Sequence, residues 1–91
     1  ADKHCASPLD CGGALAERGG LHRLRNDAVR ARPILRRALS LLGGALGPND
    51  RALASLWFDL ALVEMLDGQF HAASEKISRA ESIMRANLPP D

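Results

Sequence analysis

The stretch ARPILRRALSLLGGALGPN, residues 31–49, returns as ASEKISRAESIMRANLPPD, residues 73–91, after a shift of 42 positions. The identical pairs are Ala31/Ala73, Arg37/Arg79, Ala38/Ala80, Ser40/Ser82, Leu46/Leu88 and Pro48/Pro90. A fixed period of tens of residues is typical of repeat proteins, in which each unit buries its apolar face on the next. Such units usually serve as surfaces for partners, so the period predicts binding rather than catalysis.

The composition favours helices. Alanine and leucine dominate the 91 residues, tyrosine and threonine are absent, and β-branched residues are few. This balance suits helices and disfavours strands, so we expect one all-α domain of antiparallel helix pairs stacked as a short solenoid. No apolar run approaches the roughly 20 residues that span a membrane. The start at Ala1 favours an exported protein after removal of a signal peptide, although a trimmed chain would look the same.

Hydrophobic periodicity predicts four helices after an irregular lead-in at residues 1–8. Their expected ranges are 9–25, 28–43, 50–66 and 69–87, grouped as a degenerate first repeat, 9–49, and a clearer second repeat, 50–91. Glycines weaken the first helix at about 1 kcal/mol each. Pro33 should kink the second helix or delay its start to Arg32. The third helix is apolar on two sides, with Phe58 and Met65 on the second, and should therefore be central.

The second repeat carries a family pattern. Its signature residues are Trp57, Leu60, Ala61, Gly68, Phe70, Ala73, Ile77 and Ala80. At these separations they resemble a tetratricopeptide repeat, and the 42-residue period resembles the long-helix subclass found in kinesin light chains. The resemblance implies that Ala61 and Ala73 let paired helices approach, and that Gly68 makes the turn with Phe70 filling the gap beside it. Trp57 then belongs to the core rather than to a ligand platform.

The resemblance also implies a groove for a partner peptide or protein, lined by the first helix of each pair. The polar candidates on these helices are Arg18, His22, Arg25, Asp59 and Glu64. Ordinary solvated positions are the alternative for all of them. Because two repeats make little groove and the third helix is apolar on two sides, we expect a homodimer, or else an accessory subunit that folds fully only within a larger complex.

The charge distribution offers a second function. Net charge is +3 over residues 1–50 and −2 over residues 51–91, and seven arginines fall between Arg18 and Arg37. This basic cluster could bind nucleic acid or another acidic ligand. No aromatic side chain interleaves with it for base stacking, so a solvated face, or pairing with the acidic half of a neighbouring molecule, is favoured over nucleic acid.

The remaining reactive side chains predict no catalytic site and no cofactor. Cys5 and Cys11 do not have the spacing of zinc or thioredoxin-like motifs, and a disulfide between them is slightly favoured over two free thiols. A metal site made by His4, Cys5 and Cys11 lacks a fourth ligand and is the weakest alternative. No nucleophile, phosphate-binding or metalloprotease motif occurs in the chain. We therefore expect a non-catalytic protein without a bound metal.

Overall fold

The computed structural model describes residues 5–89, and these form four helices with no strand among them. The helices are α1 (Pro8–Leu24), α2 (Ala28–Leu46), α3 (Ala52–Leu66) and α4 (Phe70–Ala86). The all-α prediction is confirmed. Residues 1–4 of the expected lead-in and residues 90–91 of the expected second repeat lie outside the described part of the chain.

Local sequence signals account for the helix boundaries. The Ser7 hydroxyl accepts a hydrogen bond from the Asp10 amide at 3.1 Å, and an Asp27 carboxylate oxygen accepts one from the Arg30 amide at 3.2 Å, so α1 and α2 have N-caps of the expected kind. Gly68 lies in the turn between α3 and α4 and has a positive φ of 76°. Glycine tolerates this left-handed conformation because it has no Cβ.

Helix α2 begins at Ala28, as its expected range has it, so the late start at Arg32 allowed for Pro33 is not observed. The expected end at Gly43 is wrong, because the helix continues through Gly43 and Gly44 to Leu46. Pro33 is exposed, so water can solvate the carbonyl that its missing N–H leaves without a donor. The glycine pair is tolerated because leucines on either side of it, Leu42 and Leu46, still pack on the core.

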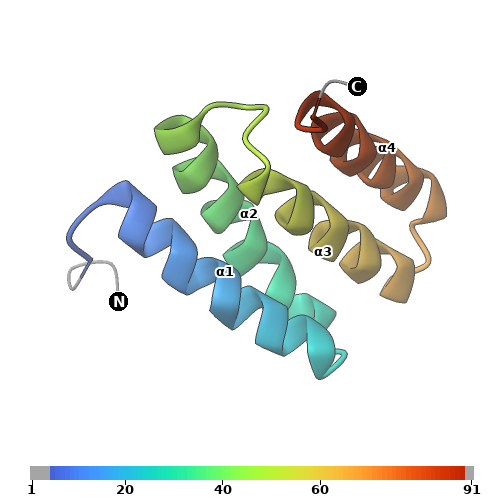
Figure 1. Cartoon of the computed structure of the whole chain (residues 1–91). Helices are drawn as coiled ribbons and strands as arrows, with labels where there is room; N and C mark the ends of the chain where they lie inside the picture. The colour runs from blue at the N-terminus through green and yellow to red at the C-terminus, as the bar shows by residue number, and fades with distance from the viewer. Residues whose placement is uncertain (1–4, 90–91) are drawn as a thin grey trace.

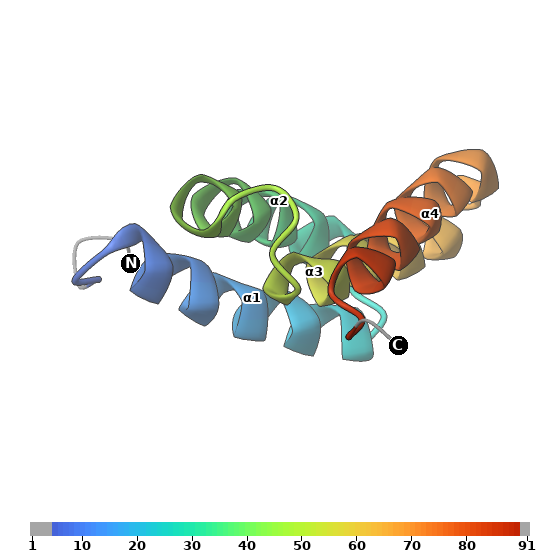
Figure 2. The same cartoon turned by 45° about the horizontal axis from the view of Figure 1, so that its top comes forward.

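The helices form two antiparallel pairs laid side by side. α1 packs along α2, α3 packs along α4, and α3 also packs on α2 and touches α1 (Figures 1 and 2). The principal extents of 43 × 34 × 17 Å describe a flat arrangement of helices. α3 therefore holds the central position that its two apolar sides predict.

The core runs through all four helices. Its fully buried large side chains are Leu35, Leu53, Leu60, Val63 and Ile83. Ala61 and Ala73 are buried, as close approach of α3 and α4 requires. Phe70 departs from expectation: it is 66% exposed at the first turn of α4 and does not fill the gap beside Gly68. Helix α4 packs on α3, and no other described helix covers the end of α4 that carries Phe70.

Two glycines in α1 mark a close approach of α1 to α2. A Cβ built on Gly12 would lie 2.6 Å from Cγ of Leu42, and one built on Gly19 would lie 2.5 Å from Cδ2 of Leu35. The two glycines are seven residues apart and so share one face of α1. The expectation that glycines only weaken this helix is therefore incomplete, since these two let α1 approach α2.

Candidate functional site: a groove between α3 and α4

An open groove of about 790 Å³ lies between α3 and α4. Ala54 and Ala80 are buried at its floor, and Phe58, Met84 and Leu88 are 47%, 60% and 67% exposed along it. Large apolar side chains in contact with water favour association with another apolar surface. The groove is therefore a candidate binding surface.

Helical spacing on both sides explains why these side chains meet. On α3, Ala54 and Phe58 are four residues apart, and on α4, Ile77 and Met84 are seven apart with Ala80 between them. Residues at these separations lie on one side of a helix. The antiparallel pairing of α3 with α4 then brings the two apolar sides together around one groove.

Hydrogen bonds hold one end of the groove in place. The Asn87 side-chain amide donates to the carbonyl of Ile83 at 2.8 Å and to the carbonyl of Asn49 at 3.0 Å. The Arg79 guanidinium donates to the carbonyl of Pro48 at 2.9 Å. These bonds tie α4 to the loop between α2 and α3. Because that end is braced, a ligand meets a largely preformed surface.

The polar residues predicted to bind a partner do not line this groove. Arg18 is exposed on α1, Arg25 is exposed at the C-cap of α1, and Nδ1 of His22 lies 3.9 Å from Oδ2 of Asp27. Asp59 pairs with Arg23, and Glu64 pairs with Lys76. Three of the five residues therefore contact side chains outside the set, and none of the five lines the groove.

The sequence signal for the groove was the helical spacing of its apolar residues. Phe58 stands on the second apolar side predicted for α3, and Met84 stands on the stripe predicted for α4. Their pattern alone matches that of core residues, because helical spacing records which residues share a side and not whether another helix covers them. For this reason Phe58 and Met84 were not among the binding residues predicted from the sequence.

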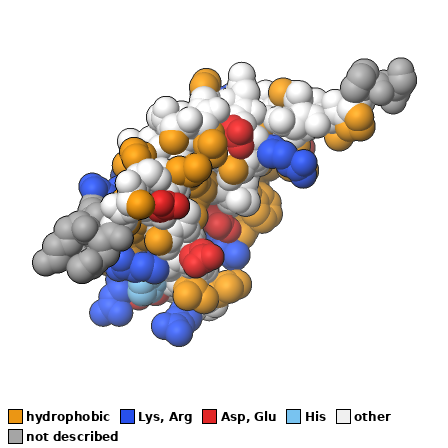
Figure 3. All heavy atoms as spheres, turned by 60° about the vertical axis from the view of Figure 1, so that its left-hand side comes forward, with side chains coloured by type: hydrophobic (Ala, Val, Ile, Leu, Met, Phe, Trp, Pro, Cys, Tyr) orange, Lys and Arg blue, Asp and Glu red, His pale blue; other side chains and the backbone are white. Residues whose placement is uncertain are grey.

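Acidic residues of the second half neutralise part of the basic cluster. Nε of Arg23 lies 2.8 Å from Oδ1 of Asp59, and Arg32 pairs with Asp67 at the end of α3. Figure 3 shows acidic side chains lying among the basic ones on one face of the molecule. The expected pairing with a neighbouring molecule is thus corrected for these two arginines, whose carboxylates belong to the same chain.

The environment of Asp59 changes its acidity. Burial against α1 raises the pKa of Asp59, and the nearby Arg23 guanidinium opposes that rise through its charge and a hydrogen bond. Burial is the larger effect, so the carboxylate is less readily ionised in the folded protein than in the unfolded chain. The ion pair positions α1 against α3 at an electrostatic cost near neutral pH.

We expect the variant Asp59→Asn to remove the electrostatic cost of burying the ionised Asp59 carboxylate. The unfolded pKa is about 3.9 and the folded pKa lies above it, so the wild type binds the proton more tightly when folded. The Asp59 contribution to stability is therefore fully present below the unfolded pKa and is lost as pH rises through the folded pKa. Urea unfolding across this range should show wild type losing stability relative to Asp59→Asn as pH rises. If the wild type instead gained stability relative to Asp59→Asn as pH rises, the Arg23 charge would lower the pKa of Asp59 by more than burial raises it.

Glu64 is the buried charged residue of the described core region. It is 6% exposed on α3, and Lys76 of α4 contacts its carboxylate. A buried carboxylate needs a partner because transfer out of water is costly. The pair therefore belongs to the packing of α3 on α4 rather than to a solvent-facing site.

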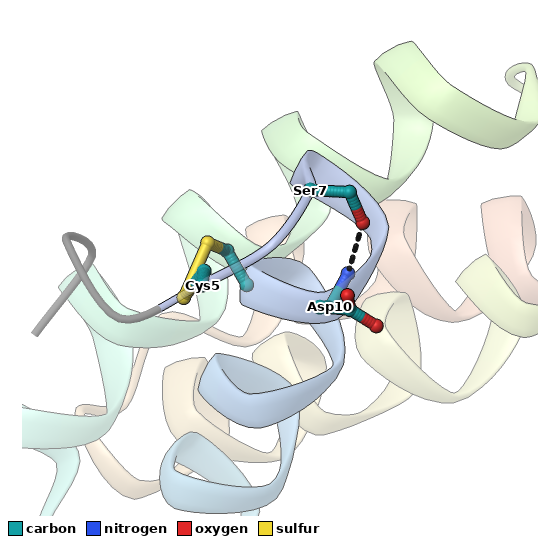
Figure 4. The surroundings of a disulfide bond; sticks show 4 residues. Cys5, Ser7 and Asp10 are labelled. Atoms are coloured by element: carbon teal, nitrogen blue, oxygen red, sulfur yellow. Dashed lines mark hydrogen bonds between the residues drawn. A yellow bond between two sulfur atoms is a disulfide. The ribbon is translucent and has the colours of Figure 1, made fainter.

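A disulfide closes the start of α1. The sulfurs of Cys5 and Cys11 lie at bonding distance, with their Cα atoms 5.1 Å apart, and both cysteines are accounted for (Figure 4). The bond joins the segment before Ser7 to the second turn of the helix. It uses the two thiols that the alternative metal site would need, and His4 of that alternative lies outside the described residues.

Two further properties concern residues 5–89. None of their helices combines the length and apolarity needed to cross a bilayer. No group of three His, Cys, Asp or Glu side chains gathers there with the geometry of a metal site.

Fold and groove together define a small all-helical protein with an open apolar surface on its second helix pair. Comparison of the chain with protein-family models, with curated proteins and with solved structures gives no match. The function is therefore inferred from the chemistry of the groove.

Proposed function

We propose that the chain is a non-catalytic interaction module that binds a segment of another polypeptide in the groove between α3 and α4. The observation that carries the proposal is the exposure of Phe58, Met84 and Leu88 around a buried apolar floor. Aromatic residues and methionine are enriched at protein interfaces, and methionine adapts to partners of different shape. Burying these side chains would remove apolar surface from water.

The polar groups at the rim suit recognition of a peptide. Arg51 at the N-cap of α3, Ser55 of α3 and Glu81 of α4 border the groove, while its interior is apolar. A few polar groups around an apolar patch orient a ligand and give specificity. Ser55 Oγ lies 3.4 Å from the carbonyl of Ala52, within its own helix. The rim therefore favours binding over chemical transformation.

The tetratricopeptide-like architecture remains part of this proposal. Supporting it are the side-by-side helix pairs, the positive φ at Gly68 and the buried Ala61 and Ala73. The exposure of Phe70 departs from the pattern. The proposed surface also differs from the one implied by the resemblance, because it lies between the two helices of one pair rather than along the first helices.

The basic cluster supports its alternative function less well. Arg23 and Arg32 already face carboxylates of α3 and its C-terminal end. Each pair lowers the positive charge that phosphate groups would meet. We therefore place the partner surface at the apolar groove.

We expect peptides selected from a displayed random library on the whole chain to bind in this groove. The variants Phe58→Asp and Met84→Asp should each weaken such peptides about tenfold or more, because losing a buried interface anchor costs about 1–2 kcal/mol. Phe58 is 47% exposed and Met84 is 60% exposed, so the variants should keep the wild-type circular dichroism spectrum. Fluorescence polarisation of the labelled peptides measures the affinities.

The matched control is Val29→Asp. Val29 is 80% exposed on α2 and does not line the groove, so the same apolar-to-acid change there should leave affinity unaltered. Equal weakening by all three variants, or a library that yields no binder, would contradict the proposed function.

A further inference from the structure

The 42-residue repeat relates the two helix pairs residue by residue. Shifted by 42, Leu35, Leu42 and Leu46 of α2 become Ile77 and Met84 of α4 and Leu88 just after it. The three α2 residues lie in or against the core, whereas Met84 and Leu88 are exposed and line the groove. Positions that are covered in the first helix pair are therefore open to solvent in the second pair.

α3 is the helix that completes the covering of the first pair. It packs on α2 and also touches α1. A Cβ on Gly43 of α2 would lie 3.9 Å from Cδ1 of Leu53, and Arg23 of α1 pairs with Asp59. α3 thus sits across both helices of the preceding pair.

Two residues of α1, one packed against the core and one paired with Asp59 of α3, have exposed apolar counterparts. Ala16 and Arg23 become Phe58 and Met65 under the same shift, and both of these are nearly half exposed. The surface that receives α3 on the first pair is therefore repeated on the second pair with apolar residues from both α3 and α4. The groove therefore corresponds, under the 42-residue shift, to an interface that the chain already uses within itself.

We infer that the groove binds an amphipathic helix whose apolar side repeats that of α3. This inference rests on the proposed function and specifies the class of partner. The large aliphatic residues among those buried on α3 are Leu53, Leu56, Leu60 and Val63, at spacings of three, four and three. A partner helix with large aliphatic residues at these spacings fits the groove by the same packing.

Charge makes the partner different from α3 at defined positions. Asp59 faces Arg23 on the first pair, but Met65 stands in the place of Arg23 on the second. A partner helix should therefore carry an apolar residue where α3 carries Asp59. Glu81 replaces Leu39, so a basic residue on the partner side opposite Glu81 would complete the contact.

α1 of a second copy is a poor occupant of the groove. The positions equivalent to Leu53, Leu56 and Leu60 are Cys11, Ala14 and Arg18. Cys11 is bonded to Cys5, and Arg18 would place a charge over apolar residues. Head-to-tail stacking of identical chains is disfavoured on these grounds, and the partner is a helix of a different polypeptide.

The test uses two labelled synthetic peptides and the full chain. Both copy residues 52–66 with Phe58, Leu62, Met65 and Leu66 replaced by Lys or Glu for solubility, and one also carries Asp59→Leu. On the wild-type protein, the peptide with Leu should bind about tenfold more tightly than the peptide with Asp. A peptide of the same composition in scrambled order should bind at least about tenfold more weakly than the peptide with Leu.

The variant Met65→Arg tests the register. Met65→Arg places on α3 the cation that Arg23 provides on α1. The peptide with Asp should then bind more tightly than the peptide with Leu, which reverses the order of affinities on the wild type. Met65 is 44% exposed, and circular dichroism checks that the variant folds. Sedimentation at the same concentrations shows whether the protein is a monomer or a dimer.

The remaining outcomes separate this inference from the proposed function. Peptides that bind equally, with no response to Met65→Arg but with loss on Met84→Asp, would overturn the inferred register while leaving the groove as a binding surface. A dimer that Met84→Asp dissociates and that excludes the peptides would also overturn the helix partner. Failure of these peptides together with failure of every library peptide would overturn both.

Discussion

The double variant Gly12→Ala/Gly19→Ala is expected to be about 2–4 kcal/mol less stable than the wild type, although alanine is the better helix former. The added methyl groups would lie within 2.6 Å of Leu42 and Leu35, whose side chains are packed in the core. Relief requires moving α1 away from α2 or forcing both leucines from their rotamers. Urea unfolding at neutral pH measures the loss.

The control is Gly13→Ala/Gly44→Ala. Both glycines lie inside helices, and an added Cβ would meet nothing within 4 Å at either. This variant should be about 1–2 kcal/mol more stable than the wild type, because only helix propensity changes. Two changes of the same kind therefore have opposite effects. Stabilisation by both variants would show that α1 does not pack against α2 at the described separation.

The variant Lys76→Met should lower the free energy of unfolding by about 2–3 kcal/mol. Methionine keeps the aliphatic packing of the lysine stem but leaves the carboxylate of Glu64 buried without its cation. The effect lies below the range for fully buried pairs because the lysine side chain is 21% exposed. Chemical unfolding of the single variant gives the magnitude.

Two further variants identify the cause. Glu64→Leu/Lys76→Met should return to within about 1 kcal/mol of the wild type, since no unpaired charge remains. Arg30→Met removes a cation from an exposed pair with Asp27 and should change stability by less than about 0.5 kcal/mol. If the double variant were as unstable as Lys76→Met, lost packing rather than the unpaired carboxylate would explain the effect.

Long-range ion pairs illustrate what lay beyond sequence analysis. The excess of arginine before residue 38 and of acids after residue 50 indicated that pairing was available. Which carboxylate meets which arginine depends on how α1 and α2 lie against α3. The structure selects Asp59 for Arg23 and Asp67 for Arg32. No local pattern encodes these partners, because each pair joins helices far apart in the chain.

The exposed apolar residues also show which properties the sequence predicted and which depend on the tertiary structure. Helical spacing placed Phe58 on a second apolar side of the third helix and Met84 on a stripe of the fourth. Spacing by itself made both of them core candidates. Their exposure follows from the end of the described helix array, because α4 has α3 on one side and no described helix on the other.

The amino-acid sequence alone determined the all-α class, the four helices to within a few residues, the central place of the third helix and the favoured cysteine pairing. The properties of the helices depend on local propensity, capping residues and the period of apolar side chains, all of which act over one or two helical turns. The cysteine pairing was favoured because the spacing of Cys5 and Cys11 matches no metal or redox motif. Tertiary structure alone decided that Gly12 and Gly19 seat leucines of α2, that Phe70 faces solvent, and that an apolar groove opens between α3 and α4. Each of these depends on which surfaces of different helices meet, and the burial of a side chain is settled only when its neighbours are in place.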